Sequence, residues 1–92
     1  MKNSEIAAVF TEIADLLEQK KDDFFKIRAY RRVAQSITDL SVNVEQLSAE
    51  GRLKEVPGVG EAIANKITEL VNTGRLEYLE KLKTEMAGVG DG

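Results

Sequence analysis

Apolar residues recur every three or four positions along most of the chain, and this spacing limits the fold more than any other feature of the sequence. Side chains at this spacing share one face of an α-helix. The pattern runs through residues 6–17, 25–40, 61–73 and 76–86. No stretch alternates apolar and polar residues over more than about four positions, as a half-buried strand would. The sequence therefore predicts an all-α fold, a compact bundle of four to five helices.

Local signals indicate where these helices begin and end. Asn3 and Ser4 are favourable N-cap residues for the first helix, and residues 43–46 resemble a capping box that begins a short third helix. Residues 52–56 favour another short helix, which Pro57 ends because the residue before a proline disfavours helical backbone. A longer helix then follows Gly60 and runs to about Thr73. Gly74 stands where a left-handed C-terminal cap belongs.

Length and composition place these helices in a single domain. With 92 residues, 42% of them hydrophobic, the chain suits one modest core. We expect the domain to span residues 1–87. Residues 88–92, mostly glycine, have little side chain to pack, so we expect them to form a flexible tail.

The residue types that are missing exclude several classes of function. Because the chain has no Cys and no His, it has no disulfide, no Cys/His zinc site and no thiol or imidazole catalyst. No apolar run approaches the roughly 20 residues that span a bilayer, so we expect no membrane association and a cytoplasmic location. The net charge of −3 argues against a nucleic-acid partner, since such domains are usually basic, although the local field at the contact surface decides.

The segment Val56-Pro57-Gly58-Val59-Gly60 is the strongest candidate for a functional site. Its glycines can take backbone angles that are closed to other residues, and they let another chain approach closely. The helix that follows presents free N–H groups and the positive end of its dipole, which suits a phosphate oxygen. Val59 is expected to point inward and fix the turn. A phosphate site built from backbone amides reads no base edges, so binding should be independent of sequence.

The segment also resembles three other structures: a plain interhelical turn, a dinucleotide-binding loop and a Walker A loop. It can be a tight interhelical turn with no ligand, which the segment alone does not exclude. A dinucleotide-binding loop requires a third glycine where the chain has Ile63, and a Walker A loop requires Ser or Thr where Ile67 follows Lys66. Both nucleotide-binding loops are therefore excluded by spacing.

Several further segments, in the same order along the chain, resemble the N-terminal domain of family X DNA polymerases, with its helix-hairpin-helix motif. The matching stretches are residues 3–7, 25–32, 53–60, 64, 66–67 and 73–76. The resemblance implies binding of DNA at gaps, nicks and 5′-phosphate ends, and in some members removal of a 5′-deoxyribose phosphate through a lysine Schiff base.

The resemblance also assigns residues to these roles. Lys66 matches the Schiff-base lysine. The residues implied to bind DNA phosphate are Gly58, Val59, Gly60, Lys26, Tyr30, Arg31 and Lys66. The main-chain carbonyls of Lys54, Val56 and Val59 are implied to hold a monovalent cation, Na⁺ or K⁺, and no other cofactor is expected.

The sequence departs from the family in the pocket around Lys66. Basic positions of the animal enzymes are Ala62 and Tyr78 here, and an acidic position beside the lysine is Asn65. The expected pocket is therefore less cationic, and Lys66 can also be a lysine at a helix edge that extends to phosphate or water. Tyr30 and Phe25 are aromatic residues that more often belong to a hydrophobic core than stack on bases.

Three hypotheses follow for the function. The first is a monomeric module that binds gapped, nicked or single-stranded DNA without regard to sequence. The second is a deoxyribose-phosphate lyase that uses Lys66. The third is a helical protein-interaction domain that has lost DNA binding, which the acidic composition supports. The chain is too short to contain a polymerase palm domain as well.

Overall fold

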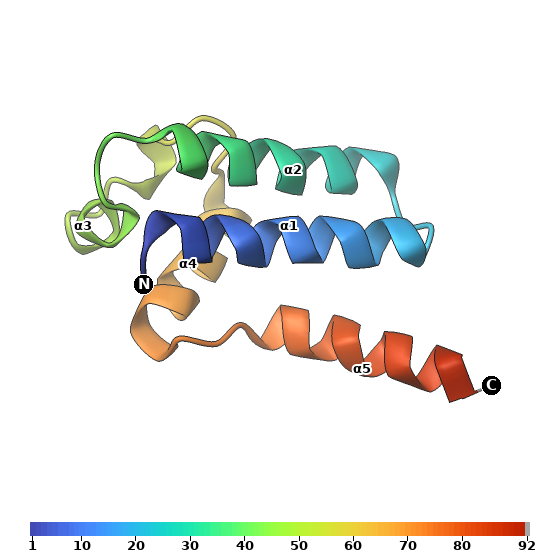
Figure 1. The fold of residues 1–92 in the computed structure, drawn as a ribbon. Coiled ribbons are helices and arrows are strands. Elements are labelled where there is room, and N and C mark those ends of the chain that lie inside the picture. The colour runs from blue at the N-terminus through green and yellow to red at the C-terminus, as the bar shows by residue number, and fades with distance from the viewer. Residues whose placement is uncertain (92) are drawn as a thin grey trace.

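The computed structural model describes the backbone of residues 1–91 and the side chains of residues 1–87, and it confirms the all-α prediction. The described residues contain no strand. The elements are α1 (Asn3–Gln19), α2 (Phe24–Asp39), α3 (Val44–Ala49), the 3₁₀ turn η1 (Leu53–Glu55), α4 (Glu61–Thr73) and α5 (Glu77–Asp91). Figure 1 shows α1 and α2 side by side and antiparallel, with α5 along the other side of α1.

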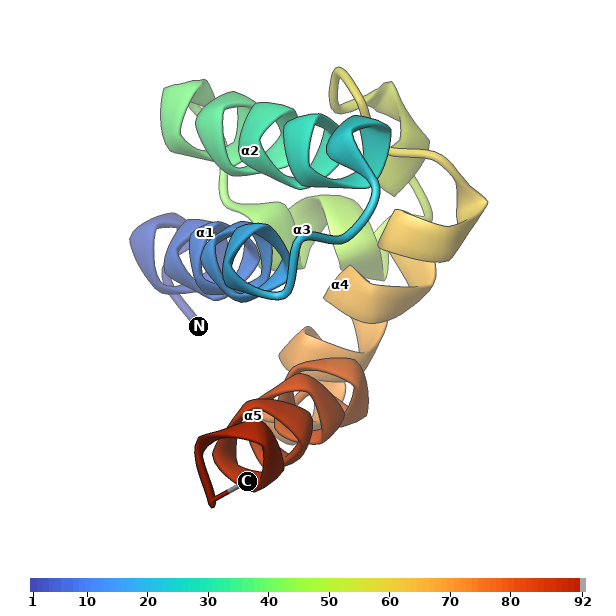
Figure 2. The ribbon, with the colours of Figure 1, turned by 90° about the vertical axis from the view of Figure 1, so that its right-hand side faces the viewer.

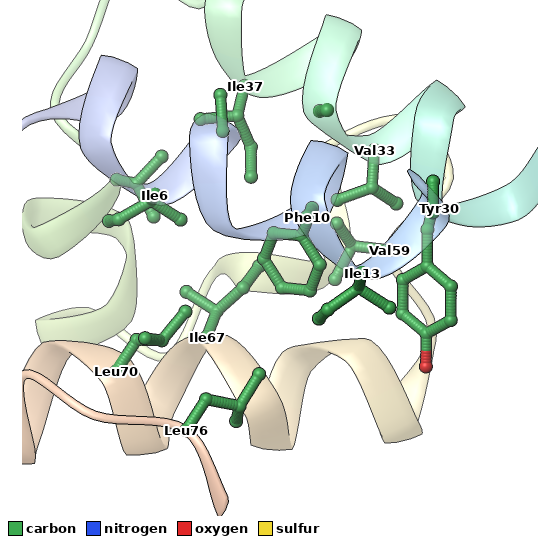
Figure 3. Close-up of a cluster of buried hydrophobic side chains, with 14 of the residues drawn as sticks. Ile6, Phe10, Ile13, Tyr30, Val33, Ile37, Val59, Ile67, Leu70 and Leu76 are labelled. Carbon is green, nitrogen blue, oxygen red and sulfur yellow. The ribbon is translucent and has the colours of Figure 1, made fainter. Parts of the chain in front are cut away.

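One hydrophobic core holds these elements together. Phe10 of α1 is fully buried and stacks on Tyr30 of α2, with ring centroids 6.0 Å apart. Figure 3 shows side chains from both helices meeting those of α4 and of the loop before it, including Val59 and Ile67. The core therefore fixes the start of α4 against the α1–α2 pair.

The first helix begins one residue earlier than its capping signals indicate. Lys2 is the N-cap, and its N–H donates to the Glu5 carboxylate at 2.7 Å. The side chain of Asn3 is used elsewhere: it accepts a hydrogen bond from the N–H of Val44 at 2.9 Å and donates to the carbonyl of Val42 at 2.8 Å. Asn3 therefore ties the start of α1 to the start of α3, a tertiary role that local capping preferences do not reveal.

The other helix boundaries follow local signals. Asp23 caps α2 by accepting from the N–H of Phe25 at 2.8 Å, and Asn43 caps α3 through the N–H of Glu45 at 2.7 Å. At the end of α4, Gly74 has the predicted left-handed backbone, with φ 75°. These caps fix the lengths of the helices on either side of the candidate site.

The last helix, α5, packs on α1 through a row of leucines: Leu76, just before it, Leu79 and Leu82 are all buried. Lys20 and Lys83 add ion pairs between the two helices, with Glu85 at 2.7 Å and Glu12 at 3.4 Å. The side chains of residues 88–92 lie outside the described residues, so the flexible tail stays a prediction. No helix within the described part of the chain has the length and apolar character required to cross a membrane.

Candidate nucleic-acid interface

The segment between η1 and α4, which we call the hairpin (residues 56–60), folds into a tight turn. The N–H of Val59 donates to the carbonyl of Val56 at 3.0 Å and closes the turn. Between them stand Pro57 and Gly58, and Gly58 has φ +87°. A proline followed by a residue of positive φ is characteristic of a type II turn, which favours glycine at its third position. The local sequence therefore dictates the turn, and position 58 is one that only glycine occupies without strain.

The hairpin is anchored on its inner side and open on its outer side. Val56 and Val59 are buried, and Val59 points into the core as predicted (Figure 3). Pro57, Gly58 and Gly60 are exposed, and a Cβ added at Gly60 would meet no atom within 4 Å. An approaching group can therefore reach the backbone of the turn closely.

The helix α4 starts directly after this open backbone. Its N-cap is Gly60, which has no side chain to satisfy the first N–H groups of the helix. Glu61 stands in this first turn and pairs with Lys54 of η1, which lowers the pKa of the Glu61 carboxyl through a hydrogen bond and opposite charge. The N-terminus of α4 is thus open to an anion, with one carboxylate and one ammonium group at its edge.

The cationic side chains that the resemblance assigns to DNA on α2 are paired within the protein. Arg31 donates to Asp15 at 3.0 Å and to Glu18 at 2.5 Å, both on α1. Lys26 lies 3.4 Å from Asp22, the residue one turn before it. A phosphate therefore has to compete with a carboxylate for either side chain.

The next arginine, Arg32, lies against the hairpin instead. Its side-chain atoms Cδ, Cγ and Nε come within 3.4–3.5 Å of the place where a Cβ at Gly58 would stand. Figure 2 shows α2 beside the loop that leads into α4. Arg32 is an exposed residue of α2, and no local sequence signal links positions 32 and 58, so only the fold reveals this contact.

Two aromatic residues at the start of α2 are exposed. Phe25 is 77% exposed, so the expectation that it belongs to the core is wrong, and Phe24 is also exposed. The Arg28 guanidinium lies 5.6 Å from the centroid of the Phe24 ring. Positions two apart on a helix point about 200° apart, so Phe25 lies on the side of α2 away from the buried Ile27. That spacing was the signal that could have identified it.

The departures from the family meet Lys66 in one pocket of about 410 Å³ between α4 and α5. Its lining residues are Ala62, Asn65, Lys66, Glu69, Leu76, Glu77, Tyr78 and Lys81. The Lys66 ammonium lies over the Tyr78 ring, 4.7 Å from its centroid. Two lysines and two glutamates line the pocket, so their formal charges cancel.

Tyr30, assigned to phosphate by the resemblance, is 7% exposed and belongs mainly to the core. Its ring stacks on that of Tyr78 at 6.1 Å, so it reaches the Lys66 pocket only through this neighbour. Burial raises the pKa of the Tyr30 hydroxyl, and Tyr78 adds to this effect through its charge and a hydrogen bond. The hydroxyl is therefore a neutral hydrogen-bonding group at physiological pH.

The acidic residues of the pocket also have structural partners. Glu69, one turn after Lys66, accepts a hydrogen bond from the N–H of Glu77 at 2.8 Å. This carboxylate thus caps the first turn of α5. Glu77 itself pairs with Lys81 at 3.3 Å. The residues that line the pocket therefore also help to hold α5 against α4.

The carbonyls of Lys54, Val56 and Val59 come from the two sides of the hairpin. That of Val56 already accepts the hydrogen bond that closes the turn, although a carbonyl oxygen has a second lone pair. The monovalent cation assigned to these carbonyls stays a prediction.

Two helical segments joined by a tight turn with exposed glycines define a helix-hairpin-helix module. The sequence matches the family described as a helix-hairpin-helix domain over residues 1–76. The chain belongs to this family. Domains of the family commonly bind DNA, so membership indicates nucleic-acid binding in general.

Proposed function

We propose that this protein binds DNA independently of sequence at gaps, nicks or 5′-phosphate ends. We further propose that it does so as the N-terminal domain, or a relative of that domain, of a family X repair polymerase. The observation that supports DNA binding best is the exposed outer edge of the hairpin, where Gly58 and Gly60 leave the backbone open in front of α4. Backbone amides at a helix start bind phosphate and carry no base specificity.

The exposed aromatic residues at the start of α2 support a preference for gaps over intact duplex. At a gap, an unpaired base presents its flat face, which a base in continuous duplex does not. Stacking of a base on an aromatic ring stabilises the complex by about 1–3 kcal/mol and depends little on which base is present. Phe25, which is the more exposed of the two rings, is the residue in this region best placed for it.

A salt titration tests the proposal. The affinity for gapped DNA is measured at several salt concentrations, with intact duplex of the same sequence as the control. For about two or three phosphate contacts, log affinity should fall with log salt at a slope near −2 to −3, and gapped DNA should bind more tightly than duplex. No detectable binding even at low salt would reject DNA binding and favour a protein-interaction domain.

A second candidate function is deoxyribose-phosphate lyase activity through Lys66. The observation that favours it is that Lys66 lines a pocket, with its amine 4.7 Å from the centroid of the Tyr78 ring. A lysine in such a pocket can form a Schiff base with the aldehyde of the sugar. Borohydride reduction on DNA with a 5′-deoxyribose phosphate should then give a covalent adduct that Lys66→Ala abolishes. No adduct, or one that survives this substitution, excludes Lys66 as the nucleophile.

A further inference from the structure

Three arginines of α2 stand close together in sequence, but the structure gives each a different neighbour. Arg28 lies over the ring of Phe24, and Arg31 is held by two carboxylates of α1. Arg32 is exposed, and the arm of its side chain lies against the hairpin at Gly58. Within the described residues, Arg32 has no carboxylate within ion-pair distance.

We propose that Arg32 binds the same DNA phosphate as the hairpin, so that the phosphate site is built from α2 and the start of α4 together. This inference rests on the proposed DNA binding and names a residue that acts in it. It replaces Arg31, which the family resemblance favours, as the principal arginine of the interface.

The first argument is proximity. The Cγ, Cδ and Nε atoms of Arg32 lie along the outer side of Gly58, within 3.4–3.5 Å of the place where a Cβ would stand. The guanidinium at the end of this arm is therefore held next to the open backbone of the turn. These are ordinary van der Waals distances, so the arm of Arg32 lies close to the turn without steric strain.

The second argument is availability. Arg31 already donates to Asp15 and Glu18, so a phosphate has to compete with two carboxylates that neutralise this guanidinium and raise its pKa. Among the side chains that the structure describes, none forms such a pair with Arg32. A guanidinium can donate two parallel hydrogen bonds to one phosphate, in addition to those from backbone amides.

The third argument concerns charge at the hairpin. The protein has a net charge of −3, and the first turn of α4 carries the carboxylate of Glu61. Lys54 is already paired with that carboxylate. Arg32 therefore adds positive charge at the turn, and no carboxylate of residues 1–87 lies within ion-pair distance of it. Such a local charge favours phosphate binding by an otherwise acidic protein.

The test compares Arg32→Ala with Arg31→Ala, a matched control on the same helix, in binding to gapped DNA across a salt series. Arg32→Ala should weaken binding about tenfold at low salt and make the slope of log affinity against log salt less negative by about 0.9, one phosphate contact. Arg31→Ala should weaken binding less than about threefold and leave the slope unchanged. Arg32→Lys should keep the slope and recover part of the affinity, because the charge remains and the paired hydrogen bonds do not.

The outcomes separate this inference from the proposed function. If the wild-type protein binds gapped DNA but Arg32→Ala and Arg31→Ala lose affinity equally, or Arg31→Ala loses more, the role of Arg32 is wrong and DNA binding stands. If the wild-type protein does not bind, the proposed function itself fails. Circular dichroism melting of both variants checks that each is folded, which we expect because both side chains are exposed.

Discussion

The hairpin lies just before α4 and the Lys66 pocket lies between α4 and α5. The two regions differ in the groups that they present. The hairpin presents backbone: a closed turn, the exposed glycines Gly58 and Gly60, and the first N–H groups of a helix. The pocket presents side chains, and its lysines Lys66 and Lys81 are matched by two glutamates. The phosphate binding proposed for the hairpin therefore depends on backbone conformation, whereas any proposed for the pocket depends on residue identity.

This difference predicts that the two regions respond differently to substitution. A backbone site survives many substitutions as long as its glycines and buried anchors remain, and Val56 and Val59 still hold the turn in the core. A side-chain site changes with each replacement, and Ala62 and Tyr78 stand where the resemblance to family X polymerases implies cations. In the proposed function, the start of α4 serves DNA binding, whereas the second candidate, lyase activity, depends on Lys66 alone.

The largest expected effect is that of Gly58→Ala, which disturbs the hairpin through conformation alone. At φ +87°, a residue with a Cβ is strained by about 1–2 kcal/mol. The melting temperature should fall by about 4–8 °C for each kcal/mol in a domain of this size, and affinity for gapped DNA should fall with it. Thermal melting followed by circular dichroism measures the first effect, and fluorescence anisotropy measures the second.

Gly60→Ala is the matched control for this change. Gly60 has φ −101°, which any residue adopts, and open space where a Cβ would stand. Its melting temperature should stay near that of the wild type. If Gly58→Ala melts as the wild type does, the conformation of the turn does not depend on glycine, and the contrast between a backbone site and a side-chain site loses its basis.

The next prediction concerns the pocket and adds the missing charge. Ala62→Lys places a cation beside Lys66 on an exposed position of α4. Affinity for gapped DNA with a 5′-phosphate should rise about two- to fivefold, the range expected of one exposed ion pair. Gapped DNA with a 5′-hydroxyl is the control and should gain less. An equal gain on both DNAs would mean that the pocket does not receive the 5′-phosphate.

Much of this architecture can be predicted from local sequence, and the rest depends on contacts between distant positions. The turn at Pro57 and Gly58 and the cap at Gly74 follow from backbone preferences, and the helices between them follow from apolar spacing. The hydrogen bond that the N–H of Val44 donates to the Asn3 side chain joins positions 41 apart, and no local preference reveals it. The partners of the α2 arginines are set in the same way by the packing of α1 and the hairpin against α2. For this reason, the sequence identifies the hairpin but cannot decide which arginine serves it.

The smallest expected effect is that of Glu61→Gln, at the boundary between the two regions. The Glu61 carboxylate favours the start of α4 through the helix dipole, but it also repels a phosphate that approaches the same N–H groups. Removing the charge while keeping the shape should raise affinity for gapped DNA about two- to threefold, and it also releases Lys54 from its ion pair. The melting temperature should fall slightly, since a favourable charge at the helix start is lost.

The contribution of Glu61 to stability depends on pH, whereas the expected change in affinity does not near neutral pH. Lys54 holds the pKa of the Glu61 carboxyl below its usual value in the folded protein, so the stability it contributes is present above the unfolded pKa and is lost as pH falls through the folded one. Near neutral pH the carboxylate is fully ionised, so the difference in affinity between wild type and Glu61→Gln should be constant from about pH 6 to 8. Equal affinities across this range would show that the phosphate does not approach the start of α4. The hairpin would then bind DNA, if at all, through the turn and Arg32 alone.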